Sequence, residues 1–319
     1  MAEWLIERGI AETRAILVEG EHVCAARLQW PGDISLGVEP ARLIQRRAGA
    51  KRGVARSAGG VEINVSGLAK DASEGREIAV RITRAPIAES GRLKRAQGTQ
   101  VRDGADEAAS PPSLPAGTTV HRFPSGLWED VWADAWTGEV AFAGGSLIVS
   151  PTPAMTVIDI DGDLPPRELA LAAVPAIADT LQRFDLAGSI GIDFPTLSEK
   201  AHRRAVDEAM AHALSDWPHE RTAMNGFGFV QLVARLRGPS LLHRLHYHRA
   251  SAAARMLLRR GELAEGAGPR LLLRAHPAVA DRLSQEWLGE LARRSGRKVE
   301  VERDGALALD AGHAQILAS

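Results

Sequence analysis

The sequence predicts an α/β (α+β) protein with a small β-barrel, a central sheet containing a helix crossover, and a small C-terminal α/β domain. Three observations predict this fold. Short β-like segments alternate with Gly-rich or polar turns between Val38 and Thr83. Two apolar strand-like segments, AMTVIDIDG and SIGIDF, flank a segment with helical periodicity. Two further helix-like segments, 248–263 and 277–294, precede the strand-like KVEVE.

The composition is that of an ordinary globular protein of 319 residues, 45% hydrophobic and 25% charged. The single cysteine, Cys24, excludes an internal disulfide framework and cysteine-rich zinc modules. Neither a signal peptide nor a run of 18 apolar residues is recognisable, so we expect a cytoplasmic protein that makes no membrane contact. The net charge of −1 means that any polyanionic partner must be bound by local positive charge.

The N-terminal half is predicted to be mostly β-structure. Residues 12–28 alternate as in a hairpin, with Gly20 in the turn. The segments between Val38 and Thr83 are then expected to form a five-stranded barrel. Residues 96–118 combine Gly, Ser, Asp and three prolines without apolar periodicity, which predicts a flexible linker.

The second half predicts alternating helices and strands. Apolar residues from Leu127 to Trp136 recur at helical spacing, and Gly138 follows where a C-cap is expected. Strands EVAF and SLIVS lead into TVIDI, and a helix that begins at Pro165-Pro166 separates TVIDI from SIGIDF. A helix crossover predicts that TVIDI and SIGIDF are parallel.

Asp159 and Asp193 stand at the ends of these two apolar strands. Parallel strands joined by one helix crossover lie side by side or one strand apart, so both aspartates are expected at the same sheet edge. Converging carboxylates repel, and a divalent cation relieves the repulsion. Oxygen ligands favour Mg²⁺ or Mn²⁺, and Asp161, on the same face as Asp159, can complete or orient the cluster. Such a site suits phosphodiester hydrolysis.

The same aspartates also fit a structural role. Asp159 and Asp161 can cap the following helix, and Asp193 can end its strand. Spacing alone does not decide between the structural role and the metal site.

Two blocks of sequence resemble the ribonuclease E/G family. TGEVAFAGGSLIVSPTPAMTVIDIDG is similar to the family's Gly-rich turn and strand leading into an A-I-D-V-N-like motif. LQRFDLAGSIGIDF, followed by EKAHRRAVDEAMAHAL, resembles the family's R-x-L-R-D-L-G-G-x-I-x-I-D-F block and the helix after it. The resemblance covers residues 137–242.

The resemblance implies a magnesium-dependent endoribonuclease that acts on single-stranded RNA, in RNA processing or decay, and leaves 5′-phosphate and 3′-hydroxyl ends. Asp159 and Asp193 match the family's metal-binding aspartates, whereas Asp161 replaces an asparagine that usually hydrogen-bonds the first aspartate. The implied core is RNase-H-like and deoxyribonuclease-I-like, with an inserted OB-type barrel. The implied divisions are the RNase-H-like part at 1–35 and 119–150, the barrel at 36–95, the linker at 96–118, the deoxyribonuclease-I-like subdomain at 151–247 and the C-terminal domain at 248–319.

Cations around these parts are candidates for RNA contacts. Arg221 falls near the family position of a phosphate-binding arginine. Positive side chains on the helix after SIGIDF and on the barrel could hold the phosphate backbone: Lys200, Arg203, Arg204, Arg46, Arg47, Lys51 and Arg52. The segment from Pro31 to Val120 contains no Phe, Tyr or Trp, so the barrel is expected to bind RNA weakly and with little base specificity.

Two family parts have no counterpart in the sequence. The 5′-monophosphate sensor has no room after Gln97, and the cysteine-containing zinc link is absent, so we expect no structural zinc and a monomer or a homodimer without zinc-linked assembly. His243, His246 and His248 lack a nearby acid or thiol and favour a helix-face or phosphate-contact role over a metal site. These departures leave an alternative function open, an RNA-binding family member with weak or no catalytic activity.

Overall fold

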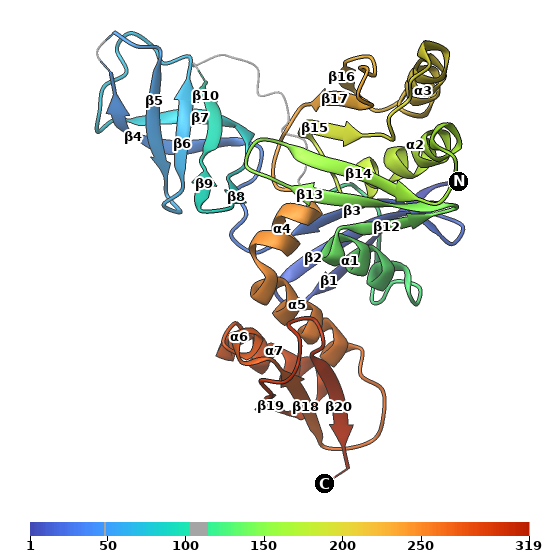
Figure 1. Cartoon of the computed structure of the whole chain (residues 1–319). Helices are drawn as coiled ribbons and strands as arrows, with labels where there is room; N and C mark the ends of the chain where they lie inside the picture. Colours follow the sequence, from blue (N-terminus) through green and yellow to red (C-terminus); the bar gives the residue numbers. More distant parts are fainter. Residues whose placement is uncertain (48, 102–113, 319) are drawn as a thin grey trace. The chain divides into compact units, whose positions relative to one another are not determined.

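The computed structural model describes residues 1–47, 49–101 and 114–318. The chain forms two compact units (Figure 1). The first comprises Met1–Pro31, Ala116–Val131 and Arg244–Ser319, and the second comprises Gly32–Pro115 and Trp132–His243. Within the described part of the chain, no helix is both long and apolar enough to cross a membrane.

A four-stranded sheet of order β11-β1-β2-β3 lies in the first unit. Its strands are β1 (Glu3–Gly9), β2 (Glu12–Glu19), β3 (His22–Gln29) and β11 (Thr118–Val120). The first three strands are antiparallel, and β11 pairs with β1 in parallel. The hairpin expected at 12–28 is therefore confirmed, and Gly20 takes the positive φ of 63° that its tight turn requires.

The C-terminal part of the first unit contains a three-stranded sheet of order β19-β18-β20. The elements from residue 241 onward are α4 (Leu241–Tyr247), α5 (Arg249–Glu262), β18 (Arg270–Ala275), α6 (Pro277–Ala280), α7 (Gln285–Ser295), β19 (Lys298–Arg303) and β20 (His313–Leu317). The single helix expected at 277–294 is wrong. The chain leaves α6 at Ala280 and restarts at Ser284, whose hydroxyl accepts a hydrogen bond from the Trp287 N–H at 3.2 Å.

Helix α5 is shared between this C-terminal part and the N-terminal sheet. Arg259 of α5 donates to the Glu7 carboxylate on β1 at 2.7 Å, and Arg255 donates to the Ala11 carbonyl at 3.0 Å. The expected boundary at residue 248 therefore does not isolate the C-terminal domain, because buried charged contacts join its first helix to β1.

A closed five-stranded barrel of order β10-β6-β5-β4-β7 forms the first part of the second unit. Its strands are β4 (Val38–Arg46), β5 (Arg52–Ser57), β6 (Glu62–Ser66), β7 (Glu77–Arg84) and β10 (Ala96–Gln100). Leu43, Ile63 and Val80 are fully buried inside it. The expected OB-type barrel is confirmed, and a small hairpin of β8 (Ile87–Glu89) and β9 (Arg92–Lys94) precedes its last strand.

The expected linker at 96–118 is wrong at both ends. Residues 96–100 form β10, which closes the barrel, and β11 includes Thr118. In β10 the inward positions are the small residues Ala96 and Gly98, and a Cβ on Gly98 would lie 2.9 Å from the Arg81 carbonyl. Only small residues fit at this crowded junction. The strand therefore lacks the alternation of large apolar and polar residues by which a strand is recognised in a sequence. Residues 102–113 lie outside the described residues.

A six-stranded sheet of order β12-β13-β14-β15-β17-β16 forms the rest of the second unit. Its strands are β12 (Glu139–Phe142), β13 (Gly145–Pro151), β14 (Thr156–Gly162), β15 (Gly188–Asp193), β16 (His219–Arg221) and β17 (Phe229–Ala234). The accompanying helices are α1 (Leu127–Thr137), α2 (Pro166–Arg183) and α3 (Lys200–Ala213).

The division expected at residue 150 falls inside one continuous sheet. Strand β13 pairs with β14 along its whole length, and β12 pairs with β13. Leu147 and Val149 of β13 are buried, as are Ile158 and Ile160 of β14, so these strands share one apolar core. Residues 139–151 therefore belong to the sheet that carries the aspartates.

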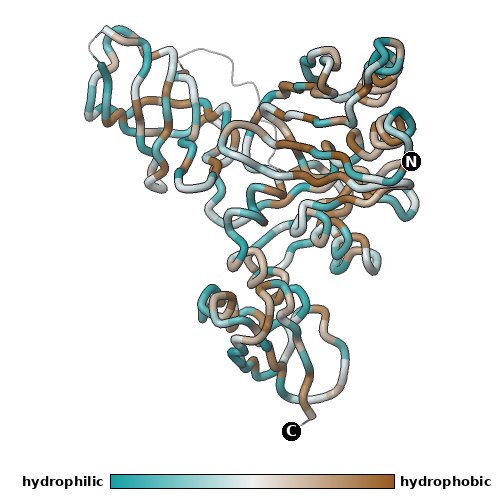
Figure 2. Tube along the Cα trace, in the orientation of Figure 1, coloured by the Kyte–Doolittle hydropathy of each residue, from teal (hydrophilic) through white to brown (hydrophobic). Residues whose placement is uncertain are grey.

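One face of this sheet is apolar and the other is open. Ile158, Ile160, Ile190 and Ile192 are all buried, on the face of the sheet against which α2 packs, and α3 packs in turn against α2. Figure 2 shows the hydrophobic stretches of the second unit following these central strands. Because side chains alternate along a strand, the residues between these isoleucines point to the opposite face.

Candidate active site

Asp159 and Asp193 occupy matching positions on neighbouring strands. Strands β14 and β15 are parallel, joined through α2, and their register pairs Asp159 directly with Asp193. The crossover therefore places the two carboxylates side by side, as the sequence predicted. Both residues are exposed, on the face of the sheet opposite the helices.

Few local contacts hold these carboxylates. Asp159 Oδ1 accepts a hydrogen bond from the Ile160 N–H at 3.1 Å. On the other side of β15, Asp193 pairs with Phe229 of β17. A Cβ on Gly191 would lie 2.5 Å from Phe229 Cζ, so the absence of a side chain at Gly191 leaves space for the Phe229 ring.

Asp161 lies on the same exposed face of β14 as Asp159, two residues further along the strand. It pairs with Ser146 of β13, away from β15. Within the described residues, no group of three or more His, Cys, Asp or Glu side chains is placed to hold a metal ion. The structure thus brings together two aspartates and leaves Asp161 beside them.

Two neighbouring carboxylates are a donor set that could hold one magnesium ion. Mg²⁺ keeps several water ligands and is commonly held by only one or two carboxylates together with substrate phosphates. The two exposed carboxylates leave the remaining coordination positions to water and substrate oxygens. The donor chemistry therefore suits Mg²⁺ or Mn²⁺ and offers neither the thiolate nor the imidazole ligands typical of zinc.

Arg221 is on the other face of the sheet. It pairs with Leu232 of β17, which is buried on the helix-covered face. Its guanidinium donates to Asp207 Oδ1 of α3 at 3.1 Å and to the Asp207 carbonyl at 2.7 Å. The structure therefore does not bring Arg221 together with Asp159 and Asp193, and the geometry indicates a structural ion pair.

The expected cations of α3 differ in their surroundings. Lys200 is exposed at the first residue of the helix. Arg203 donates to the Ser198 carbonyl at 2.8 Å, and Arg204 donates to Glu208 at 2.9 Å on the helix surface. Arg203 therefore supports the loop that precedes α3, whereas Lys200 and Arg204 lie on its surface.

The barrel cations also differ among themselves. Arg46 donates through Nε to the Ala50 carbonyl at 3.1 Å and through Nη1 to the Ala72 carbonyl, so it holds two loops together. Arg47, Lys51 and Arg52 are exposed around the turn between β4 and β5. The exposed three can meet a polyanion, whereas the Arg46 guanidinium has a structural function.

The three histidines have separate local environments. His243 Nδ1 lies 2.7 Å from the Ser240 hydroxyl at the start of α4. Burial, together with the charge of Arg249, lowers the pKa of His246, and the His248 ring packs edge-on against Trp30. His243 and His246 thus lie on α4, whereas His248 is the N-cap residue of α5.

Sequence reasoning missed the turn that precedes β17. Asn225, Gly226, Phe227 and Gly228 connect Met224 to the strand that carries Phe229. The turn hydrogen-bonds to the end of β15, because the Phe194 N–H donates to the Gly228 carbonyl at 3.2 Å. Two glycines that flank an aromatic residue just before a strand could have indicated this turn in the sequence.

Comparisons with known proteins match the segment that contains both aspartates. A family model described as the ribonuclease E/G family matches residues 134–237, which include both aspartates. Ribonuclease G of Escherichia coli (strain K12) is 36% identical over 104 residues, and ribonuclease G of Haemophilus influenzae is 36% identical over 113 residues. These alignments cover 30% and 32% of this chain but only 21% and 23% of the relatives. The segment that holds the aspartate pair is therefore similar to the ribonuclease E/G family, and the chain spans only about a fifth of the length of the curated relatives it matches.

Proposed function

We propose that the chain is a magnesium-dependent endoribonuclease that hydrolyses phosphodiester bonds of single-stranded RNA. The carrying observation is the direct pairing of Asp159 with Asp193 on adjacent parallel strands, on the exposed face of the sheet. The family and the ribonuclease G relatives support the reaction type. A cytoplasmic role in RNA processing or decay is part of the proposal.

Asp159 and Asp193 would hold Mg²⁺, and Mn²⁺ would replace it. When bound, the cation supplies polarisation of a phosphoryl oxygen and lowers the pKa of water for attack on phosphorus. Asp161 adds a third negative charge on the same face of β14, which increases the attraction for a cation. Attack of water on phosphorus with departure of the 3′ oxygen leaves a 5′-phosphate and a 3′-hydroxyl.

The backbone of the RNA would be held mainly by charge. Lys200 and Arg204 lie on the surface of α3, and Arg47, Lys51 and Arg52 surround one turn of the barrel. Contacts of this kind are sensitive to salt and read little sequence. The proposed assembly is a monomer or a homodimer without a zinc link.

The test is cleavage of a 5′-labelled AU-rich single strand in the presence of MgCl₂. Wild type should cleave it, and Asp159→Asn and Asp193→Asn should each be roughly a hundredfold slower or more, because loss of a metal ligand removes several kcal/mol of transition-state stabilisation. Asp163→Asn is the matched control, since Asp163 is exposed just beyond β14. Equal cleavage by wild type and both site variants would contradict the assignment.

A second candidate function is RNA binding with little or no catalysis. It is favoured by Asp161 in place of the family asparagine and by a barrel without aromatic residues. RNA binding by wild type without magnesium-dependent cleavage would support this alternative.

A further inference from the structure

One aromatic side chain of this protein is conspicuously exposed. The sequence contains seven Trp, one Tyr and six Phe. Across the described residues, which include all of these aromatics, Phe227 alone belongs to the exposed class, with 82% of its surface accessible. Exposure of a large apolar ring is costly in water, so its surroundings indicate whether it is a binding element.

The turn that carries Phe227 is internally hydrogen-bonded. The Asn225 side-chain oxygen accepts from the N–H groups of Phe227 at 2.9 Å and Phe229 at 3.1 Å. The Asn225 N–H donates to the Phe229 carbonyl at 3.1 Å, and the Gly228 N–H donates to the Asn225 carbonyl at 3.2 Å. Gly228 has a φ of +90°, which a side chain would strain. The exposed ring therefore projects from a fixed backbone and loses little conformational entropy on binding.

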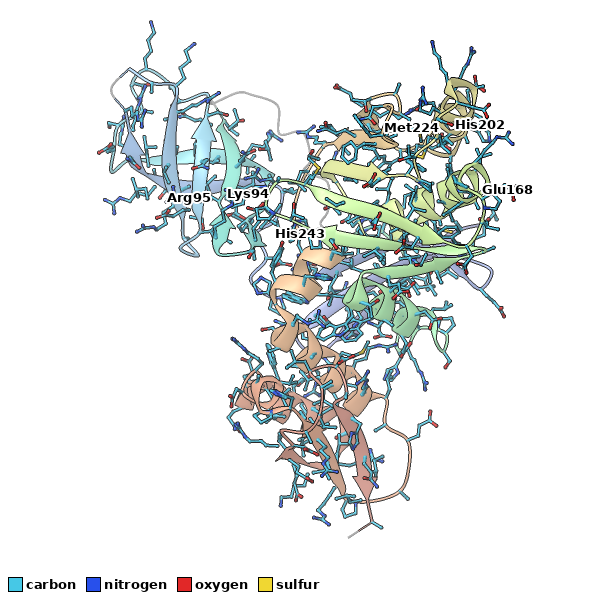
Figure 3. All side chains as sticks on the ribbon, in the orientation of Figure 1. Lys94, Arg95, Glu168, His202, Met224 and His243 are labelled. Atoms are coloured by element: carbon cyan, nitrogen blue, oxygen red, sulfur yellow. The ribbon has the colours of Figure 1, made fainter. Side chains whose placement is uncertain are left out.

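The turn is attached to the sheet on both sides. A Cβ on Gly228 would overlap the Phe194 carbonyl, which lies directly after Asp193. At the other end, the Met224 N–H donates to Asp207 Oδ1 of α3 at 3.0 Å. Figure 3 labels Met224 at this end of the sheet and His202 on α3. These contacts prevent the turn from moving independently of the strand that ends in Asp193.

The register also limits the distance from Phe227 to the aspartates. Asp193 pairs with Phe229, two residues after Phe227. Cross-strand Cα atoms are at most about 5.5 Å apart and consecutive Cα atoms about 3.8 Å, so the Cα atoms of Phe227 and Asp193 lie within about 13 Å. A nucleotide near the one at the aspartate pair can reach the ring.

The surroundings of Phe227 favour a flat, uncharged ligand group that packs on the ring. Thr222, Ala223, Asn225 and Gly226 are exposed and small or polar, and a Cβ on Gly226 would meet no atom within 4 Å. A single exposed ring is far smaller than the roughly 800 Å² per partner that a stable protein interface buries. A nucleobase matches the ring in size and presents a π-face that stacks without base specificity.

We propose that Phe227 stacks on one base of the bound single-stranded RNA and fixes the register of the strand at Asp159 and Asp193. This inference rests on the proposed RNA substrate. It assigns to the catalytic sheet the aromatic contact that the barrel cannot provide. Phe227 is thus a positioning residue for the substrate, and its ring takes no part in the chemistry.

The test uses full-length protein without divalent cation and single-stranded RNAs that carry one 2-aminopurine at successive positions. Stacking quenches 2-aminopurine fluorescence, so wild type should quench it strongly at one or two positions. Phe227→Ala should lose that quenching and bind about 5- to 150-fold more weakly, the range that loss of one base–aromatic stack gives. Phe227→Trp should restore both. Val233→Ala, which truncates a 48% exposed apolar side chain on β17, is the matched control and should resemble wild type.

Cleavage kinetics with magnesium separate this inference from the proposed function. Phe227→Ala should raise KM and leave kcat at saturating RNA nearly unchanged. If wild type cleaves RNA and Phe227→Ala has the same affinity, quenching and KM as wild type, the stacking role is overturned while the proposed nuclease activity stands. If quenching depends on Phe227 but wild type cleaves no RNA, the stacking role is supported and the proposed nuclease activity is overturned. Absence of position-dependent quenching by wild type would also overturn the stacking role.

Discussion

Replacing Glu7 with alanine should cost the first unit about 3–5 kcal/mol of its free energy of unfolding. Glu7 is 3% exposed and its carboxylate accepts hydrogen bonds from Arg14 at 2.6 Å, Arg259 at 2.7 Å and the Phe123 N–H at 3.0 Å. Arg14 is fully buried and Arg259 is 2% exposed. Removing the carboxylate leaves two buried guanidinium groups without one of their counter-charges, and that desolvation cost sets the magnitude.

Thermal and urea unfolding measure this loss. At roughly 2–4 °C per kcal/mol, the transition of the first unit should fall by roughly 6–20 °C. Glu129→Ala is the matched control, because Glu129 also pairs with Arg259 but has a 48% exposed side chain; an exposed partner is worth about 1 kcal/mol or less. Equal effects of the two substitutions would refute the reasoning that burial sets the cost.

The same carboxylate gives a pH dependence of known sign. Burial alone would raise the pKa of Glu7, but the Arg259 hydrogen bond, the charges of Arg14 and Arg259 and the Phe123 N–H together hold it below the usual 4.5. The stabilisation is therefore fully present above pH 4.5 and is lost as pH falls through the lower folded-state pKa. The stability difference between wild type and Glu7→Gln should shrink in that acidic range, and a difference independent of pH would contradict the assigned ionised state.

Three further predictions concern the second unit. Arg221→Ala and Asp207→Asn should lower the Tm by similar amounts and leave cleavage per folded molecule unchanged, because their ion pair lies on the helix-covered face. If folded Arg221→Ala selectively loses cleavage, this arginine binds phosphate instead. Combined alanine substitution of Arg47, Lys51 and Arg52 should reduce the slope of log affinity against log salt by about 2, since each single-strand phosphate contact contributes about 0.7; an unchanged slope would exclude these residues from the RNA interface. Gly98→Ala should destabilise the barrel by about 1–3 kcal/mol in a denaturant titration, because the added Cβ overpacks against β7. Gly59→Ala should be nearly neutral, because the nearest neighbour of its Cβ would be Ser57 Oγ at 3.9 Å. Similar unfolding midpoints for the two variants would contradict the packing argument.

The aspartate pair was predictable from sequence because its geometry depends on a general rule. Two apolar strands around one amphipathic helix form a right-handed crossover, and the rule fixes their direction. The structure adds the register, which pairs Asp159 with Asp193 directly. The barrel was likewise predictable from short β segments and turns, except for β10, where Ala96 and Gly98 fill a crowded junction.

Other features depend on contacts between distant residues. The β1 strand was missed because Glu7 occupies a core position, and the arginine of α5 that offsets its burial lies 252 residues away. The break between α6 and α7 depends on the local cap at Ser284, within a segment that otherwise continues the helical pattern. The face on which Arg221 lies depends on its register with Leu232, which no local spacing specifies.

Manganese binding tests the proposed two-aspartate metal site most directly. Titration of the full chain with Mn²⁺, followed by the electron paramagnetic resonance signal of the free ion, should reveal one site in wild type. Asp159→Asn and Asp193→Asn should each weaken that site by roughly tenfold or more, while Asp163→Asn should leave it unchanged. Undiminished Mn²⁺ binding in both site variants would contradict the assignment of Asp159 and Asp193 as the metal ligands.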